Sequence, residues 1–371
     1  MVAGIKSVIS TKQYGYEDLL SNLVADGCLT TMSMTTKNPR LNTDSVRVVK
    51  IRGGNVSQSV VVKGMVISRD AEGVVKKVKN CKVAVFGCGI EAASTEAKGT
   101  VLLKSAADLL AYNKSEENKM EEVISAIVAS GATAVIGSGP ISEMALHYLD
   151  KAGVMVIKII SKFDLRRICG ALGATSLIRL GAPTEDEMGE CSSIEVVEIA
   201  GRKVIKFEQE QAEDTTTATC VVRASTENVA NDVERALDDG IQTASSLCKD
   251  PRLLPGAGAT ELELCKILKN YADEVKGLDQ YGIRKFAEAL DVVPRQLAEN
   301  SGCDPSVSMH HLHASHEGAN GQNFGFDIEE CVPRDSLDAG IFDLLISKTN
   351  AMRLAVDAAL TILRVDQIVM S

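Results

Sequence analysis

The stretch of residues 231–261 constrains the fold of this chain more than any other. Its first part has the pattern of an amphipathic helix, because apolar residues recur there at three- and four-residue spacing and form one stripe. The stripe consists of Val229, Val233, Ala236, Leu237, Ile241, Ala244 and Leu247. Pro255 and a loop of small residues at 256–259 then lead into a second apolar-periodic run over 262–271. The sequence therefore predicts a helix, a glycine-containing loop and a second helix in direct succession.

This succession of elements suits the binding of a phosphate or a sugar. Gly256 and Gly258 let backbone amides approach a ligand, and the N-terminus of the following helix adds positive partial charge. A carboxylate on the preceding helix, Asp238 or Asp239, is able to orient a water molecule or to hold a metal ion. The two carboxylates flank the apolar stripe on opposite sides, so helix geometry does not choose between them. A plain turn between two helices is the structural alternative, and the local sequence leaves it open.

The composition excludes several classes of protein. With 371 residues, 45% of them hydrophobic and 24% charged, the chain is long enough for two or three folded domains. Its net charge of −10 argues against a nucleic-acid-binding surface. Because no apolar run reaches about 18 residues and the N-terminus lacks the features of a signal peptide, we expect no membrane span and a cytoplasmic location. The ten cysteines contain no CxxC pair, which predicts reduced, mainly buried thiols.

The first two thirds of the chain alternate between strand and helix patterns. A helix over 9–28, with Lys12 near its start, precedes the alternation. Between 63 and 212 the alternation predicts a parallel sheet covered by helices. Strands are predicted at 45–51, 56–67, 82–86, 132–137, 154–160, 194–199, 203–207 and 218–224, and helices at about 104–129, 140–151 (with Pro140 in the first turn) and 162–172.

The last third of the chain is predicted to be helical. Two helical segments over 277–302 are divided by Pro294, and a final helix runs over about 348–369.

Four segments carry a resemblance to a known family. They are SKFDLRRICGALGAT (161–175), NDVERALDDG (231–240), RQLAENSG (295–302) and ILRVDQIVM (362–370), in this order. With them, essentially the whole chain resembles the group II chaperonins. The segments STKQYG, MALHY, EDEMGEC and KFAEAL resemble the theta subunits of the eukaryotic cytosolic chaperonin, TRiC/CCT.

The resemblance implies an α/β multidomain chaperonin subunit. Residues 63–212 would form an α/β apical domain that binds substrate and carries a helical protrusion acting as a lid. Residues 1–62 and 213–254 would form a small, discontinuous α+β intermediate domain, with 1–12 at the equatorial junction. Residues 255–371 would be an all-α remnant, the C-terminal part of the equatorial ATP-binding domain.

The same resemblance implies roles for particular residues. Asp239 falls on the catalytic position, which selects it over Asp238. Ala257 departs from the middle glycine of the family loop. The cofactor-binding set would be Lys12, which senses the terminal phosphate, with Gly256, Ala257, Gly258, Asp327 and Asp343, and Gly325 also borders the nucleotide. Unfolded substrate would be bound by Phe163, Leu165, Arg166, Ile168, Cys169 and Leu172. The apolar members of that set have the alternative of packing into the domain core.

The activity implied is that of an ATP-dependent chaperone. It would fold clients such as actin and tubulin with ATP and Mg²⁺, together with the other subunits of a hetero-oligomeric double ring, without nucleic acid or membrane. Family members carry a Gly-Asp-Gly-Thr phosphate loop and a metal-binding Asp in an N-terminal equatorial part, and no such tetrapeptide occurs in this sequence. We therefore expect this part to be missing, which leaves ATP hydrolysis by this chain uncertain. A client-binding module without turnover is the alternative.

Two other sites remain as alternatives. The predicted strand 82–86 is followed by Gly87 and Gly89 in a G-x-G-x-x-A pattern, with Asp108 about 20 residues on, which is typical of dinucleotide binding. Four of the five histidines cluster within seven residues, a pattern that a structural metal site also shows. They are His310, His311, His313 and His316.

Overall fold

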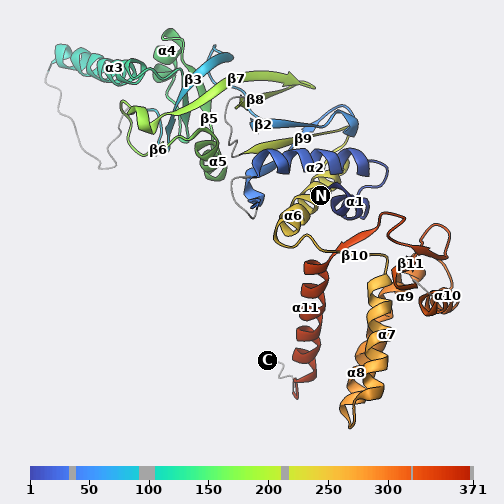
Figure 1. Ribbon diagram of the computed structural model, residues 1–371. Coiled ribbons are helices and arrows are strands. Elements are labelled where there is room, and N and C mark those ends of the chain that lie inside the picture. Colours follow the sequence, from blue (N-terminus) through green and yellow to red (C-terminus); the bar gives the residue numbers. More distant parts are fainter. Residues whose placement is uncertain (33–38, 92–104, 210–216, 319–320, 368–371) are drawn as a thin grey trace. The chain divides into compact units, whose positions relative to one another are not determined.

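The computed structural model describes residues 1–32, 39–91, 105–209, 217–318 and 321–367 (Figure 1). The chain divides into two compact units. Unit 1 comprises residues 1–21 and 239–371, and unit 2 comprises residues 22–238. The predicted three-domain division stays a prediction, with the predicted apical part and most of the predicted intermediate part lying in unit 2.

Unit 2 is built on one nine-stranded sheet in the described part of the chain. The strand order is β1-β9-β2-β8-β7-β3-β4-β5, with β6 paired to β3. The bounds are β1 Val46–Arg52, β2 Val60–Ile67, β3 Lys77–Phe86, β4 Ala134–Gly137, β5 Met155–Lys158, β6 Ser176–Leu177, β7 Gly189–Ile199, β8 Arg202–Glu208 and β9 Ala218–Ala224.

The sheet is mixed, so the predicted parallel sheet is confirmed for only part of its strands. Strands β3, β4, β5 and β6 pair in parallel, as do β1 and β9, but β2, β7 and β8 pair in antiparallel fashion. The reason is the length of the connections, because a parallel pair needs a long crossover. Between β7 and β8 the chain turns through only Ala200 and Gly201, both with positive φ, and this forces a hairpin.

Gly64 lets one strand serve two neighbours. Residues 60–63 of β2 pair with β9, and residues 64–67 pair with β8. At the change of partner, Gly64 has φ +119°, and the Thr219 hydroxyl donates a 2.8 Å hydrogen bond to its carbonyl oxygen. A Cβ atom there would lie 2.1 Å from the Phe207 carbonyl oxygen, so only glycine fits.

The helices of unit 2 cover both faces of the sheet, as the strand period of two requires. Its helices are α3 Ala106–Ala129, α4 Glu143–Lys151 and α5 Lys162–Leu172, with most of α2 Glu17–Thr31 and the first half of α6 Glu227–Lys249. In β4, Val135 faces a core cluster shared with α3 and α4, and Ile136 faces a second cluster shared with α5. Figure 1 shows α3 and α4 together beside β3.

Two helix predictions in the first half of the chain need correction. The helix expected over 9–28 is instead α1 Val2–Ser10 and α2, separated by a turn in which Gly15 has φ +91°. Lys12 therefore follows the end of a helix and does not open one. Helix α4 starts later than expected because the Ser142 hydroxyl caps it, accepting from the Ala145 amide at 3.1 Å. Pro140 consequently lies outside the helix.

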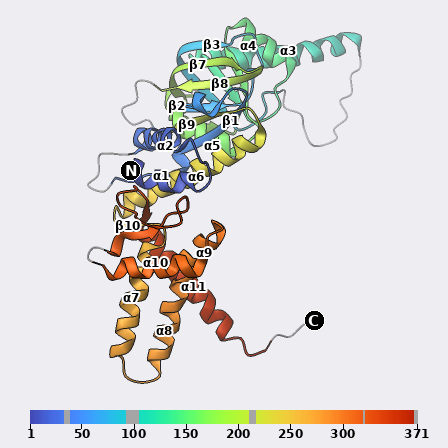
Figure 2. The same cartoon turned by 90° about the vertical axis from the view of Figure 1, so that its right-hand side faces the viewer.

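Unit 1 is mostly helical. Besides α1 and the end of α6, it contains α7 Ala259–Glu274, α8 Asp279–Leu290, α9 Val292–Asn300, α10 Pro305–Glu317 and α11 Leu345–Leu363. Figure 2 shows α7 and α8 side by side as a long helical hairpin. Two short antiparallel sheets, which the all-α prediction did not include, join β10 Leu253–Pro255 to β13 Phe342–Leu344 and β11 Phe324–Phe326 to β12 Pro333–Asp335.

Helix boundaries in unit 1 also differ from the prediction. The break between α8 and α9 falls at Asp291, and Pro294 lies in the first turn of α9, where its missing amide costs little. Helix α11 ends at Leu363, several residues earlier than expected. Short 3₁₀ turns occupy Thr43–Ser45, Val56–Gln58, Glu185–Glu187 and Gly321–Asn323, and the second of these delays the start of β2.

The cysteines follow the prediction with one exception. Cys28, Cys81, Cys191, Cys220 and Cys265 are buried and belong to no disulfide. Cys303 and Cys331, however, form a disulfide, with Cα atoms 6.3 Å apart and a sequence separation of 28. Spacing along the chain gave no sign of this pair because only the fold brings α9 near the β11–β12 turn. Among the described residues, no helix combines the length and the apolar content needed to cross a bilayer.

Candidate functional site

The loop 256–258 is the centre of the candidate site. Its backbone is bonded to two segments that lie far away in sequence. The Gly256 amide donates to the Ile341 carbonyl at 3.1 Å, and the Phe326 amide donates to the Ala257 carbonyl at 3.0 Å. The Ser336 hydroxyl donates to the Gly256 carbonyl at 3.1 Å. The fold therefore assembles the predicted positions 256–258, 325–327 and 343 around one loop.

Close backbone packing explains the glycines of this assembly. A Cβ on Gly325 would lie 2.5 Å from the Ser336 hydroxyl oxygen and 2.7 Å from the Ala257 Cβ. Gly256 lies against Ile341, and Gly258 has φ +81° as it opens α7. Ala257 adopts φ +56° although it carries a Cβ, a conformation that costs about 1–2 kcal/mol. Ala257 thus adopts the left-handed backbone conformation typical of glycine, at the one loop position where the sequence departs from the middle glycine of the family.

The N-terminus of α7 lies at this loop. Gly258 is its N-cap residue and provides no side-chain hydrogen bond to the first amides. The Thr260 hydroxyl turns back to the Pro255 carbonyl at 2.7 Å. The first turn of a helix carries positive partial charge, which favours an anion beside the loop.

Asp343 stands at the edge of the same loop. Its Oδ2 atom lies 3.0 Å from Lys348 Nζ, and Lys348 also bonds Glu261 in the first turn of α7. Burial lowers the pKa of Lys348, but the hydrogen bond and charge of Glu261, together with Asp343, outweigh it and raise the pKa above its usual value. Sequence reasoning missed Glu261 and Lys348. The acidic residue directly before the predicted helical run 262–271 was the one available signal.

Asp327 is engaged within its own turn. Its Oδ1 accepts the Glu329 amide at 2.9 Å, and its Oδ2 accepts from Arg334 at 3.1 Å. Burial raises its pKa, but the Glu329 amide and the Arg334 guanidinium outweigh this and leave the pKa lowered. Asp327 therefore stabilises the β11–β12 turn as a carboxylate, and its contact with a ribose stays a prediction.

Asp239 and Lys12 form an ion pair, each with 42% of its side chain exposed. The pair distinguishes Asp239 from Asp238, which is exposed. Neighbouring residues bring the same N-terminal segment to the site, because the Phe342 amide donates to the Ser7 hydroxyl at 3.0 Å and the Tyr14 hydroxyl donates to Glu329 at 3.2 Å. The candidate catalytic carboxylate and the candidate phosphate-sensing lysine are thus in direct contact.

The candidate substrate-binding set on α5 divides into two groups. Leu165, Ile168 and Leu172 are buried in the core against the sheet, which contradicts their predicted role because they have no surface to offer. Phe163, with 73% of its surface exposed, and Arg166 remain accessible.

Three further residues on or near α5 bear on its predicted role in substrate binding. Cys169 is half-buried against the same core, and burial raises the pKa of its thiol. Sequence reasoning missed two exposed apolar residues, Ile160 just before α5 and Ile178 just after β6. Neither stood out, because each continues the apolar pattern of its strand.

The dinucleotide alternative gains no support from the described residues. The Gly87 amide donates to the Leu177 carbonyl at 2.7 Å, so it is not free to bind a pyrophosphate. The helix that this alternative needs falls on residues 92–104, which lie outside the described part of the chain, as does the side chain of Asp108.

Within the histidine cluster, His316 has a structural role. This side chain is buried, with Nε2 2.7 Å from the Phe324 carbonyl and Nδ1 3.4 Å from Glu263. Within the described ranges, no group of three or more His, Cys, Asp or Glu side chains is arranged to hold a metal ion. His316 therefore supports the start of β11.

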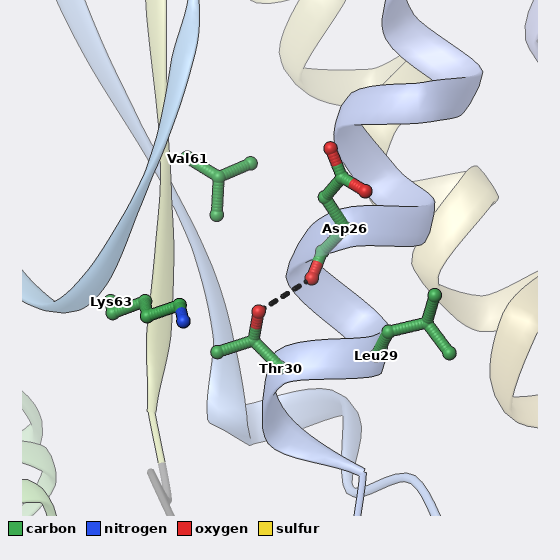
Figure 3. Close-up of a pocket in the computed structure, with 5 residues that line it drawn as sticks. All are labelled: Asp26, Leu29, Thr30, Val61 and Lys63. Carbon is green, nitrogen blue, oxygen red and sulfur yellow. Dashed lines mark hydrogen bonds between the residues drawn. The ribbon is translucent and has the colours of Figure 1, made fainter. Parts of the chain in front are cut away.

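A separate hollow of about 460 Å³ lies in unit 2 between α2 and β2 (Figure 3). It is lined by Asp26, Leu29, Thr30, Val61 and Lys63. The Thr30 hydroxyl is used within the helix, where it donates to the Asp26 carbonyl at 2.7 Å. None of these residues belongs to the predicted site.

Comparison with known proteins gives consistent matches. Residues 1–371 match the TCP-1/cpn60 chaperonin family. The chain is 44% identical to the T-complex protein 1 subunit theta of Dictyostelium discoideum over 99% of its own length and 68% of that protein. It is also 44% identical to the human T-complex protein 1 subunit theta, over 99% of its own length and 66% of that protein. The chain thus spans about two thirds of the length of these relatives.

A solved structure matches as well. It is the open-state monomer of a group II chaperonin from Methanococcoides burtonii, with a TM-score of 0.71 at 27% sequence identity. The match covers 98% of this chain and 85% of that one.

Proposed function

The chain belongs to the TCP-1/cpn60 chaperonin family, which confirms the resemblance predicted from its sequence, and we propose that it acts as a theta-type subunit of a hetero-oligomeric, ATP-dependent chaperonin. In this role it works in the cytoplasm with the other subunits of a ring and folds unfolded proteins of the actin and tubulin type. The mixed α/β fold and the group II chaperonin neighbour agree with the predicted fold class.

The observation that carries the proposal is the assembly around loop 256–258. Three segments separated by about 70 and 15 residues meet there through hydrogen bonds to the loop backbone, beside the N-terminus of α7, which favours an anion. Amides at the start of α7 would face phosphate, and Asp343 would accept hydrogen bonds from ribose hydroxyls. Magnesium would arrive on the phosphates of ATP and supply charge neutralisation there.

Asp239 has the chemistry of a residue that orients water for attack on the terminal phosphate. In this structure its carboxylate is occupied by Lys12. An exposed ion pair is worth about 0–1 kcal/mol, so a phosphate is able to replace Asp239 as the partner of Lys12 at little cost. Exchange of that partner would free Asp239 for water.

Client binding would involve the exposed residues near α5. Phe163 is the exposed aromatic side chain of that helix, Arg166 lies three residues on, and Ile160 adds apolar surface just before the helix. Exposed apolar side chains beside a cation suit unfolded chains of mixed composition. A client-binding module without ATP turnover is the second candidate function, since no Gly-Asp-Gly-Thr sequence occurs in these 371 residues.

The test of the ATPase is turnover and binding of MgATP by the purified chain and by Asp239→Ala. The neighbouring Asp238→Ala is the matched control, because both change one carboxylate on the same helix. We expect the Asp239 variant alone to lose turnover by about 100-fold or more while still binding ATP, as the loss of a positioned base implies. ATP binding without turnover in the unchanged protein would favour the client-binding module.

The test of client binding is suppression of aggregation of chemically denatured actin. Phe163→Ala should weaken the suppression, whereas Val74→Ala, which changes another highly exposed apolar residue of unit 2, should leave it unchanged. Equal effects of the two variants would argue against a specific role for α5.

A further inference from the structure

Lys348 joins two carboxylates that belong to different elements. On one side it bonds Oε1 of Glu261 in the first turn of α7. On the other side its Nζ lies 3.0 Å from Oδ2 of Asp343, at the middle of β13. Lys348 itself is in the first turn of α11. One ammonium group thus ties α7, β13 and α11 together beside loop 256–258.

Of the two carboxylates bonded to Lys348, Glu261 is the one held in a fixed position. Only 5% of the Glu261 side chain is exposed, and its Oε2 is buried with no hydrogen-bond partner among the described residues. Burying a carboxylate to this extent is costly unless a cation is paired with it, and Lys348 is that cation. Breaking the Glu261–Lys348 bond is therefore costly, and the position of the Lys348 ammonium is determined by the core of unit 1.

Asp343 is the carboxylate whose orientation is able to change. Its side chain is 38% exposed, and among the described residues only Oδ2 is bonded. A Cβ built on Gly256 would lie 3.5 Å from this oxygen, so the carboxylate lies over the loop. Without Lys348, nothing else in the described structure holds the Asp343 side chain in this orientation. The second oxygen, Oδ1, keeps its capacity to accept hydrogen bonds.

We propose that Lys348 is a positioning residue, which holds one oxygen of Asp343 so that the other accepts hydrogen bonds from the ribose hydroxyls of a nucleotide. The inference rests on the proposed nucleotide binding at loop 256–258. Lys348 does not touch the nucleotide. It fixes the orientation of the Asp343 carboxylate. The Asp343 side chain therefore loses its conformational freedom when the protein folds, and not when the ligand binds.

A purely structural role is the competing explanation, because loss of Lys348 leaves Glu261 buried without a partner. The double variant Glu261→Gln with Lys348→Met separates the two, since it removes both buried charges together and leaves Asp343 in place. Lys348→Arg keeps a cation at the position and serves as the conservative variant. Lys285→Met removes an exposed lysine of α8 and is the control.

The experiment compares the binding of MgATP and of Mg-2′,3′-dideoxy-ATP to the full 371-residue chain by calorimetry. Hydrogen bonds to a charged acceptor are worth enough for the unchanged protein to prefer ATP by roughly tenfold or more. In the double variant the preference should fall to within about twofold while the melting temperature stays near that of the unchanged protein. Lys348→Arg and Lys285→Met should keep the preference.

Each other outcome overturns the inference in a recognisable way. A double variant that keeps the full preference for ATP shows that Lys348 serves the fold alone. Equal binding of both nucleotides by the unchanged protein leaves nucleotide binding in place but removes the ribose contact of Asp343, and Lys348 then has nothing to position. Absence of any ATP binding by the unchanged protein removes the proposed function and the inference together.

Discussion

Strands β4 and β5 of unit 2 and helix α11 of unit 1 are both rich in apolar residues, yet they bury them very differently. Val135, Ile136, Val156 and Ile157 are all at 0% exposure, whereas Leu345–Leu363 contains no buried residue and Leu354 is 68% exposed. The strands have helices on both faces. Apolar periodicity therefore defines which face a helix would bury, but it does not supply the partner that buries it.

The polar side chains differ between the two units as well. In unit 1, buried or half-buried charged groups hold the turns and helix ends around loop 256–258, as in Lys348–Glu261 and Asp327–Arg334. In unit 2 the two large core clusters are apolar. The comparison implies that unit 2 depends mainly on apolar burial and unit 1 on electrostatics and turn geometry, and four predictions test this.

The largest difference is expected between Ile136→Ala in unit 2 and Leu354→Ala in unit 1. Truncation of a fully buried isoleucine leaves a cavity and should lower the free energy of unfolding by about 2–5 kcal/mol. Truncation of the exposed leucine should change it by no more than about 0.5 kcal/mol. Urea unfolding followed by circular dichroism measures both. Comparable losses in the two variants would mean that α11 is packed in solution.

Asp327→Ala should destabilise unit 1 by about 1–3 kcal/mol at neutral pH, because it removes two hydrogen bonds to a charged acceptor. The pKa of Asp327 is lowered in the folded state, so its stabilisation is present above the unfolded pKa of about 3.9 and is lost as the pH falls through the folded value. The difference from the unchanged protein should therefore shrink in acid. Thermal unfolding between pH 7 and pH 3 tests this, with Asp357→Asn on the exposed helix α11 as the control. A difference that does not depend on pH would contradict the assignment.

Gly258→Ala should destabilise unit 1 by about 1–2 kcal/mol, because a Cβ at φ +81° is strained and would lie 2.9 Å from the Pro294 Cβ. Gly282→Ala is the matched control within α8, where no other atom lies within 4 Å of the added Cβ. It should instead stabilise by about 0.5–1 kcal/mol, since alanine favours a helix interior. Changes of the same sign in both variants would argue against the turn geometry described for the loop.

The smallest effect is expected for Lys12→Met. Its ion pair with Asp239 is exposed, so the free energy of unfolding should fall by about 0–1 kcal/mol, and by less at high salt. Chemical unfolding at low and at 1 M salt measures the difference. A loss above 2 kcal/mol that persists in salt would show that this pair, like Lys348–Glu261, belongs to the buried electrostatics of unit 1.

Prediction from the sequence was accurate where periodicity alone decides the structure. Strand β9 and helix α5 were predicted at their observed residues, and β1 and α3 to within two residues of their observed ends. It failed where a turn decides, as in the split of the helix expected over 9–28 and in the hairpin of β7 and β8. Positive φ values at Ala200 and Gly201 reverse the chain within two residues, the turn containing Gly15 interrupts the expected helix, and no apolar pattern records either turn.

The candidate site shows the same division. Loop 256–258 was singled out from its residues, because close backbone approach leaves a mark in the local sequence, whereas Asp239, Gly325 and Asp343 were chosen through the resemblance to the family. Only the tertiary structure distinguished the exposed Phe163 from the buried Ile168 on one helix, placed Cys331 beside Cys303, and joined Glu261 to Asp343 through Lys348. Local sequence encodes the conformation of the backbone and the chemistry of each side chain. Burial and pairing depend on which distant segment packs against that side chain, and this is decided when the whole chain folds.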